Sequence, residues 1–128
     1  MWFWNGLPND ARGVTGYLFT RGSDKLAISG KGAAPGRLMF SHLVGRTEVI
    51  PKTWNHVVLV RDGAAVGVYL NGKSEISGEV NPSAGVELFI GGQKDASSSF
   101  EGKIDELAVY RRSLKSVEIV RRYKDSGL

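Results

Sequence analysis

The sequence predicts an all-β fold: an antiparallel jelly-roll β-sandwich with one short C-terminal helix. Apolar and polar residues alternate with a period of two along most of the chain, which is typical of half-buried strands. Glycine supplies 17 of the 128 residues, roughly twice its usual share, which indicates many turns between short strands. Helical spacing appears only after Ser116, and a single helix cannot cover a parallel sheet.

Each element has its own signal. Strands are expected at residues 2–4, 14–20, 26–29, 36–41, 48–50, 54–61, 66–71, 73–76, 86–90 and 100–110. The stretch 54–61 is apolar on both faces, so it is expected to be a central strand that is covered on both sides. Asn71-Gly72 predicts a two-residue hairpin turn, because both residues tolerate positive φ. Ser116 is expected to cap the helix at its start and Gly127 at its end.

Composition excludes several kinds of site. The chain has no cysteine, so it forms neither a disulfide nor a thiol nucleophile, and its two histidines cannot build a three-histidine metal centre. No apolar run is long enough to span a membrane. At 128 residues, a single domain covering residues 1–128 is expected.

The net charge of +4 comes from residues 111–128, since basic and acidic side chains balance in residues 1–110. A solvated helix face explains these cations best. The alternative is a nucleic-acid patch, but only Tyr123 could stack on a base there. We therefore predict no nucleic-acid partner and no membrane insertion.

Several strings carry a family resemblance. They are WNHVV at residues 54–58, DG at 62–63, VYLNGK at 68–73, LFIGG at 88–92 and FEGKIDELAVY at 100–110. Together they resemble laminin-G-like domains of the concanavalin A-like lectin/glucanase superfamily over about residues 14–124. Structural roles are expected for Trp54, His56, Tyr69, Asn71, Gly72, Ile104 and Asp105. Trp54 is expected to fill the core rather than stack on sugar, and His56 to be a hydrogen-bonded core histidine rather than a base.

The resemblance also bears on where the domain begins. Family members carry further residues before the aromatic strand at residues 2–4, so this chain resembles an N-terminally short domain that lacks one or two opening strands. It is expected to be a piece of a larger exported protein, extracellular or periplasmic. Without these strands, one sheet edge would have no strand partner within the domain. We expect this edge either to pair with a second chain, as an edge-strand dimer, or to be covered by a loop.

Candidate ligand-binding residues lie in three loops expected at the rim, Asn5–Gly13, Ala33–Gly36 and Gln93–Ser99, and beside them. They are Asn9, Asp10, Arg12, Arg37, Gln93 and Asp95. No cofactor is expected. Calcium is the one ion considered, with Asp105, Asp95 and Gln93 as candidate ligands. In a regular strand Asp105 would share the apolar face of Leu107 and Val109, where accepting backbone N–H groups is the favoured role.

The favoured function is a non-catalytic protein-interaction, spacer or adhesion module of a larger exported protein. The alternative is a carbohydrate-binding module, assisted by calcium. Glycan hydrolysis is disfavoured, because Glu101, Asp105 and Glu106 do not have the spacing of paired catalytic carboxylates. The predicted partners are a carbohydrate or protein ligand and other domains of the parent chain.

Overall fold

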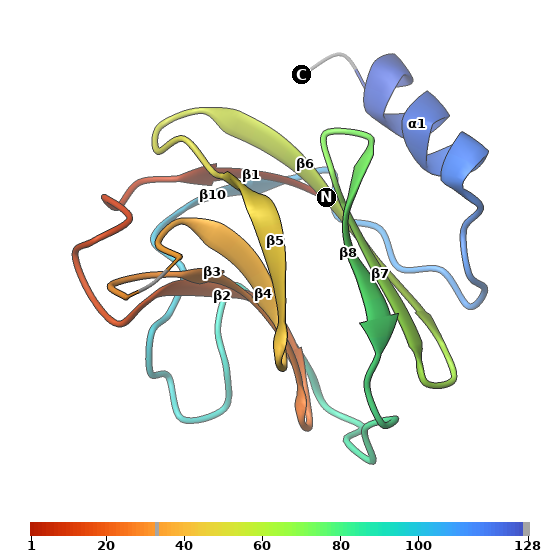
Figure 1. Cartoon of the computed structure of the whole chain (residues 1–128), viewed down its shortest axis with the longest axis horizontal. Coiled ribbons are helices and arrows are strands. Elements are labelled where there is room, and N and C mark those ends of the chain that lie inside the picture. The colour runs from red at the N-terminus through yellow and green to blue at the C-terminus, as the bar shows by residue number, and fades with distance from the viewer. Residues whose placement is uncertain (33, 127–128) are drawn as a thin grey trace.

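The computed structural model describes residues 1–32 and 34–126. It contains ten strands and one helix, arranged as two packed sheets (Figure 1). The strands are β1 (Trp2–Asn5), β2 (Val14–Arg21), β3 (Asp24–Ser29), β4 (Arg37–Phe40), β5 (Leu43–Glu48), β6 (Trp54–Asp62), β7 (Ala65–Leu70), β8 (Lys73–Glu79), β9 (Leu88–Ile90) and β10 (Gly102–Asp105), and the helix is α1 (Ser116–Asp125).

Sheet A has the strand order β10-β1-β6-β7-β8 and sheet B the order β5-β4-β3-β2-β9. Every pairing between named strands is antiparallel, so the predicted all-β sandwich with a short C-terminal helix is confirmed. The core lies between the sheets. Phe3, Val57, Val68 and Ile76 come from sheet A, and Leu18, Leu26, Ile28, Leu38 and Phe40 from sheet B. Burial of each of these side chains contributes about 1.5–3 kcal/mol to the free energy of folding.

An ion pair connects the two sheets at one end of the core. Arg61 on β6 donates to both carboxylate oxygens of Asp24 on β3, with Nη2–Oδ1 at 2.8 Å and Nε–Oδ2 at 3.2 Å. The same guanidinium donates to the carbonyls of Val80 and Asn81. Arg61 thereby fixes the chain after β8 against both sheets.

Two predicted strands are wrong. The strand expected at 48–50 is instead β5, because Ser41 adopts a φ of 54° and turns the chain back directly after β4. The strand expected over 100–110 is only β10. Glu106 has a φ of 48°, a left-handed conformation that ends the ladder, and residues 106–115 form an extended strap leading to α1.

Helix α1 lies on the outer face of sheet A (Figure 1). Its N-cap is Lys115, not Ser116 as predicted, because Glu118 Oε1 accepts the Lys115 backbone N–H at 3.1 Å. Ile119 is fully buried, and the Tyr123 ring contacts the rings of Trp2 and His56. Gly127, expected to be the C-terminal cap, lies outside the described residues. No helix in the described part of the chain is long and apolar enough to cross a membrane.

Candidate functional site

The predicted rim loops do meet at one end of the sandwich. The backbone N–H of Lys31, just before the middle loop, donates to Arg12 O at 2.9 Å, and the N–H of Tyr17 on β2 donates to Ser98 O in the third loop at 3.2 Å. The Arg12 guanidinium donates to Ser99 O and lies 3.3 Å from a Glu101 carboxylate oxygen. Arg12 therefore joins two of the loops, a positioning role that uses much of its donor capacity. Ala33, in the middle loop, lies outside the described residues.

The other predicted ligand residues are divided between surface and interior. Asn9 is buried, and its amide donates to Glu48 Oε1 at 3.1 Å and Val49 O at 2.8 Å, so it holds the first loop against β5. Asp10 is exposed and Arg37 is half-buried. Ligand binding by these residues stays a prediction.

Gln93 and Asp95 line a groove of about 540 Å³ on the outer side of sheet B. Lys25 and Phe89 line it as well, whereas the predicted residues from the other two loops do not. The pKa of Asp95 lies below its usual range, mainly because its carboxylate accepts the backbone N–H of Ser97 and secondarily because it accepts the Ser97 hydroxyl. The groove thus combines a carboxylate, an amide, an ammonium and an aromatic ring.

Asp105 does not share a strand face with Leu107 and Val109, which corrects the prediction. Its strand ends at this residue, its side chain is exposed, and Oδ1 accepts the N–H of its own neighbour Glu106 at 2.8 Å. Asp105 is not part of the groove that holds Gln93 and Asp95. Within residues 1–32 and 34–126, no three histidine or acidic side chains are placed to hold a metal ion.

His56 is buried, but it is not the hydrogen-bonded core histidine that was predicted. It points to the outer face of sheet A and packs against the rings of Trp2 and Tyr123, with centroid distances of 5.1 Å and 5.9 Å. Its Nδ1 has no hydrogen-bond partner among the described residues. Burial, and secondarily the charge of the Met1 ammonium, lowers the pKa of His56 to about 4. The ring is therefore neutral at pH 7.

The Asn71-Gly72 turn is confirmed, with φ angles of 51° and 80°. Asn71 also ties the turn to β6: its Oδ1 accepts His56 N–H at 2.8 Å, and its Nδ2 donates to Asn55 Oδ1 at 3.0 Å. Gly72 lies against the Tyr123 ring. Tyr69 and Ile104, the remaining residues with predicted structural roles, are half-buried.

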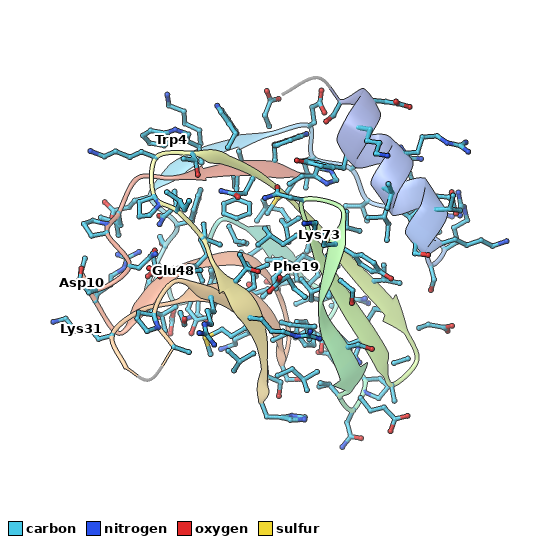
Figure 2. All side chains as sticks on the ribbon, turned by 45° about the horizontal axis from the view of Figure 1, so that its top comes forward. Trp4, Asp10, Phe19, Lys31, Glu48 and Lys73 are labelled. Carbon is cyan, nitrogen blue, oxygen red and sulfur yellow. The ribbon has the colours of Figure 1, made fainter. Side chains whose placement is uncertain are left out.

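Lys103, Trp4 and Trp54 form a row across β10, β1 and β6, here called the aromatic row. The register pairs Trp4 with both Lys103 and Trp54, so the three side chains share one face of sheet A. That face is the outer one, since Phe3, the neighbour of Trp4, points into the core. Figure 2 shows Trp4 on the side away from Phe19, which points between the sheets.

Trp54 therefore does not fill the core, and that prediction is wrong. The core side of β6 is the side of Val57, and Trp54 alternates to the opposite face, where it is half-buried. Helix α1 covers the neighbouring Trp2, which is 4% exposed, and leaves the row partly open to solvent. Alternation in residues 2–4 places Trp2 and Trp4 on one face, but only the pairing of β1 with β6 brings Trp54 to that face.

A second surface lies where β6 runs past the end of β1. Met1 pairs with Val57 through N–H···O bonds of 3.0 Å and 2.9 Å, but no described strand pairs with Val58–Asp62 on the side away from β7. A trench of about 970 Å³ opens there between β6, sheet B and the strap. Its apolar lining includes Leu107 and Val109, which are 50% and 71% exposed.

Comparison with family models settles the family. A model described as the concanavalin A-like lectin/glucanases superfamily, in its laminin G form, matches residues 5–120. The chain belongs to this superfamily. The predicted resemblance is thereby confirmed over nearly the whole domain. Comparison with curated proteins finds no match.

Two solved structures share the fold of this concanavalin A-like domain. One is domain 4 of AbnA, a GH43 extracellular arabinanase from Geobacillus stearothermophilus, in complex with arabinotriose. Its TM-score is 0.68 and its sequence identity 20%, and the alignment covers 94% of this chain and 62% of that one. The other is an S-layer domain-containing protein (residues 221–444) from Clostridium thermocellum: TM-score 0.50, 16% identity, 91% of this chain and 66% of that one. The chain thus spans less than two thirds of either neighbour.

Proposed function

We propose that this concanavalin A-like domain is a non-catalytic glycan-binding module of a larger exported protein. The observation that carries the proposal is the aromatic row, in which Trp4 and Trp54 stand side by side on the outer face of a rigid sheet and remain partly open to solvent. The C–H face of a sugar ring packs against the negative face of an aromatic ring, so adjacent indoles can hold consecutive sugars.

The neighbours support the same reading. One is a domain of an extracellular arabinanase in complex with arabinotriose, and the other belongs to an S-layer domain-containing protein. Each is part of a larger protein, and the arabinanase is extracellular, which fits an accessory module. Because the identities are 20% and 16%, the choice of glycan for this chain depends on its own residues.

Affinity electrophoresis through gels containing arabinan, xylan or mixed-linkage β-glucan tests the proposal. At least one polysaccharide should retard the domain without being cleaved. Trp4→Ala and Trp54→Ala should each weaken binding about fivefold, since an aromatic contact is worth about 1 kcal/mol. Phe89→Ala, in the groove on sheet B, is the matched control and should bind like the unmodified domain.

Two results would contradict the proposal. Either no glycan retards the domain, or Phe89→Ala weakens retardation while Trp4→Ala and Trp54→Ala, checked by circular dichroism to be folded, leave it unchanged. The second result would move the site to the groove of Gln93 and Asp95. Release of reducing ends from any of the polysaccharides would contradict the non-catalytic part.

A second candidate function, protein interaction, is favoured by the open edge of β6. Along β6, every second residue turns its backbone N–H and C=O away from β7. Leu59 therefore directs both groups into the trench. Arg61 directs its N–H there, while its carbonyl oxygen accepts a hydrogen bond from Ser113 Oγ at 3.4 Å. Such an edge can add one strand of another polypeptide.

Sedimentation equilibrium across a hundredfold range of protein concentration tests edge pairing between two copies. A dimer that Val60→Lys converts to monomer would support it, because Val60 lines the trench. A monomer at every concentration would exclude the edge-strand dimer.

A further inference from the structure

The ammonium group of Lys103 lies over the ring of Trp4. Its Nζ is 4.7 Å from the ring centroid, within the range of a cation–π contact. A sugar stacking on this ring must share the ring surface with the ammonium or displace it. The choice of ligand therefore depends on what a sugar offers to a positive charge.

No described carboxylate neutralises Lys103. None of the ion pairs formed within residues 1–32 and 34–126 involves it. Glu101, two residues earlier, is paired with Arg12 at 3.3 Å. Asp105 lies two residues further along β10, toward the end of the face that α1 covers, and its Oδ1 accepts the Glu106 N–H.

A second lysine lies in the turn that leads into β6. Lys52 is exposed in the turn before β6, two residues ahead of Trp54, and its backbone N–H donates to Asn5 O at 2.7 Å. That bond fixes the turn beside the end of β1, next to Trp4. The ammonium of Lys103 thus lies over Trp4, and the backbone of a second lysine lies beside the end of the strand that carries Trp4.

We propose that the aromatic row selects polysaccharides whose rings carry carboxylates, that is, uronate-containing glycans. The proposal rests on the glycan-binding function given above. When a neutral sugar stacks on Trp4, the Lys103–Trp4 contact is lost and the displaced ammonium finds no anion on the ligand. A uronate stacked on Trp4 places its carboxylate beside Lys103, so an ion pair with the ligand replaces the contact between the ammonium and the indole ring. The charge on the ligand then adds to the stacking.

Polygalacturonate and its methyl ester are the matched probes, because they share a backbone and differ in charge. Isothermal titration at low salt should show about three- to tenfold tighter binding of polygalacturonate, the range for one exposed ion pair with partial loss of a cation–π contact. The preference should shrink at 0.5 M NaCl. Lys103→Gln should bring the two affinities within about twofold.

Lys31→Gln is the control variant, since Lys31 projects from a loop of sheet B away from Trp4 (Figure 2). It should keep the full preference. Equal binding of both probes by the unmodified domain overturns the inference, as does a preference that survives in Lys103→Gln. Arabinan binding that depends on Trp4 and Trp54, without any preference for charge, would overturn the inference and leave the glycan-binding function standing. Failure of every polysaccharide to bind would remove both.

Discussion

Lowering the pH from 7 to 5 should destabilise the folded domain through His56. The ring is enclosed by Trp2 and Tyr123, and burial lowers its pKa to about 4. In the unfolded chain the pKa returns to about 6.5. Between these values the unfolded chain binds a proton that the folded chain does not. The contribution of neutral His56 is therefore complete above pH 6.5 and declines as the pH falls toward 4.

The magnitude follows from the two pKa values. At pH 5 the unfolded imidazole is almost fully protonated and the folded one about one-tenth protonated, which amounts to about 2 kcal/mol of unfolding free energy. Stopping at pH 5 keeps the assay above the range in which most carboxylates titrate. Replacing His56 by Phe keeps an aromatic ring packed against Trp2 and Tyr123 and removes the titrating group.

Urea unfolding followed by tryptophan fluorescence at pH 7 and pH 5 measures the effect. The unmodified domain should lose about 2 kcal/mol more than His56→Phe over this interval. His42→Gln, a change at an exposed histidine, should retain the pH dependence of the unmodified domain. If His56→Phe and the unmodified domain lose stability in parallel, the burial argument for His56 is refuted.

Three further outcomes are expected. Arg61→Met should lower the unfolding free energy, measured by urea unfolding, by about 3–5 kcal/mol, because it leaves Asp24 buried without its partner. Adding Asp24→Leu should recover most of this loss. If the losses of the two single variants simply add in the double variant, the two residues are not a coupled pair. Gly72→Ala should lower the unfolding free energy by about 1 kcal/mol or more, since the φ of Gly72 is 80° and a Cβ would lie 3.0 Å from the Tyr123 ring. An unchanged urea midpoint would show that this turn tolerates a side chain. Millimolar CaCl₂ should leave the melting temperature unchanged in differential scanning fluorimetry, and an increase reversed by EDTA would restore a calcium site at the rim.

The sequence predicts the sandwich because local and tertiary preferences agree along most strands. Ala65–Leu70 alternates with a period of two, and Asn71-Gly72 favours a tight reversal because both residues tolerate positive φ. The end of β10 was not predictable from this pattern. Alternation continues past Asp105, but Glu106 adopts a left-handed backbone that is unusual for a glutamate.

The site was less predictable, because period-two alternation shows which residues share a face but not which face is covered. Trp54 and His56 were correctly placed on one side of β6. Only the packing of Tyr123 onto that side shows that His56 is buried there and that Trp54 stays partly open. Lys103 reaches Trp4 through strand pairing between the two ends of the chain, a register that no local pattern encodes.

Nuclear magnetic resonance of the tryptophan indole N–H groups tests glycan binding by the aromatic row most directly. The chain has three tryptophans, and Trp2, 4% exposed beneath α1, is an internal control next to Trp4 and Trp54. Titration with oligogalacturonate should shift the indole signals of Trp4 and Trp54 and leave that of Trp2 in place. If arabino-oligosaccharides and oligogalacturonates both leave the Trp4 and Trp54 signals unmoved, the row is not the glycan site.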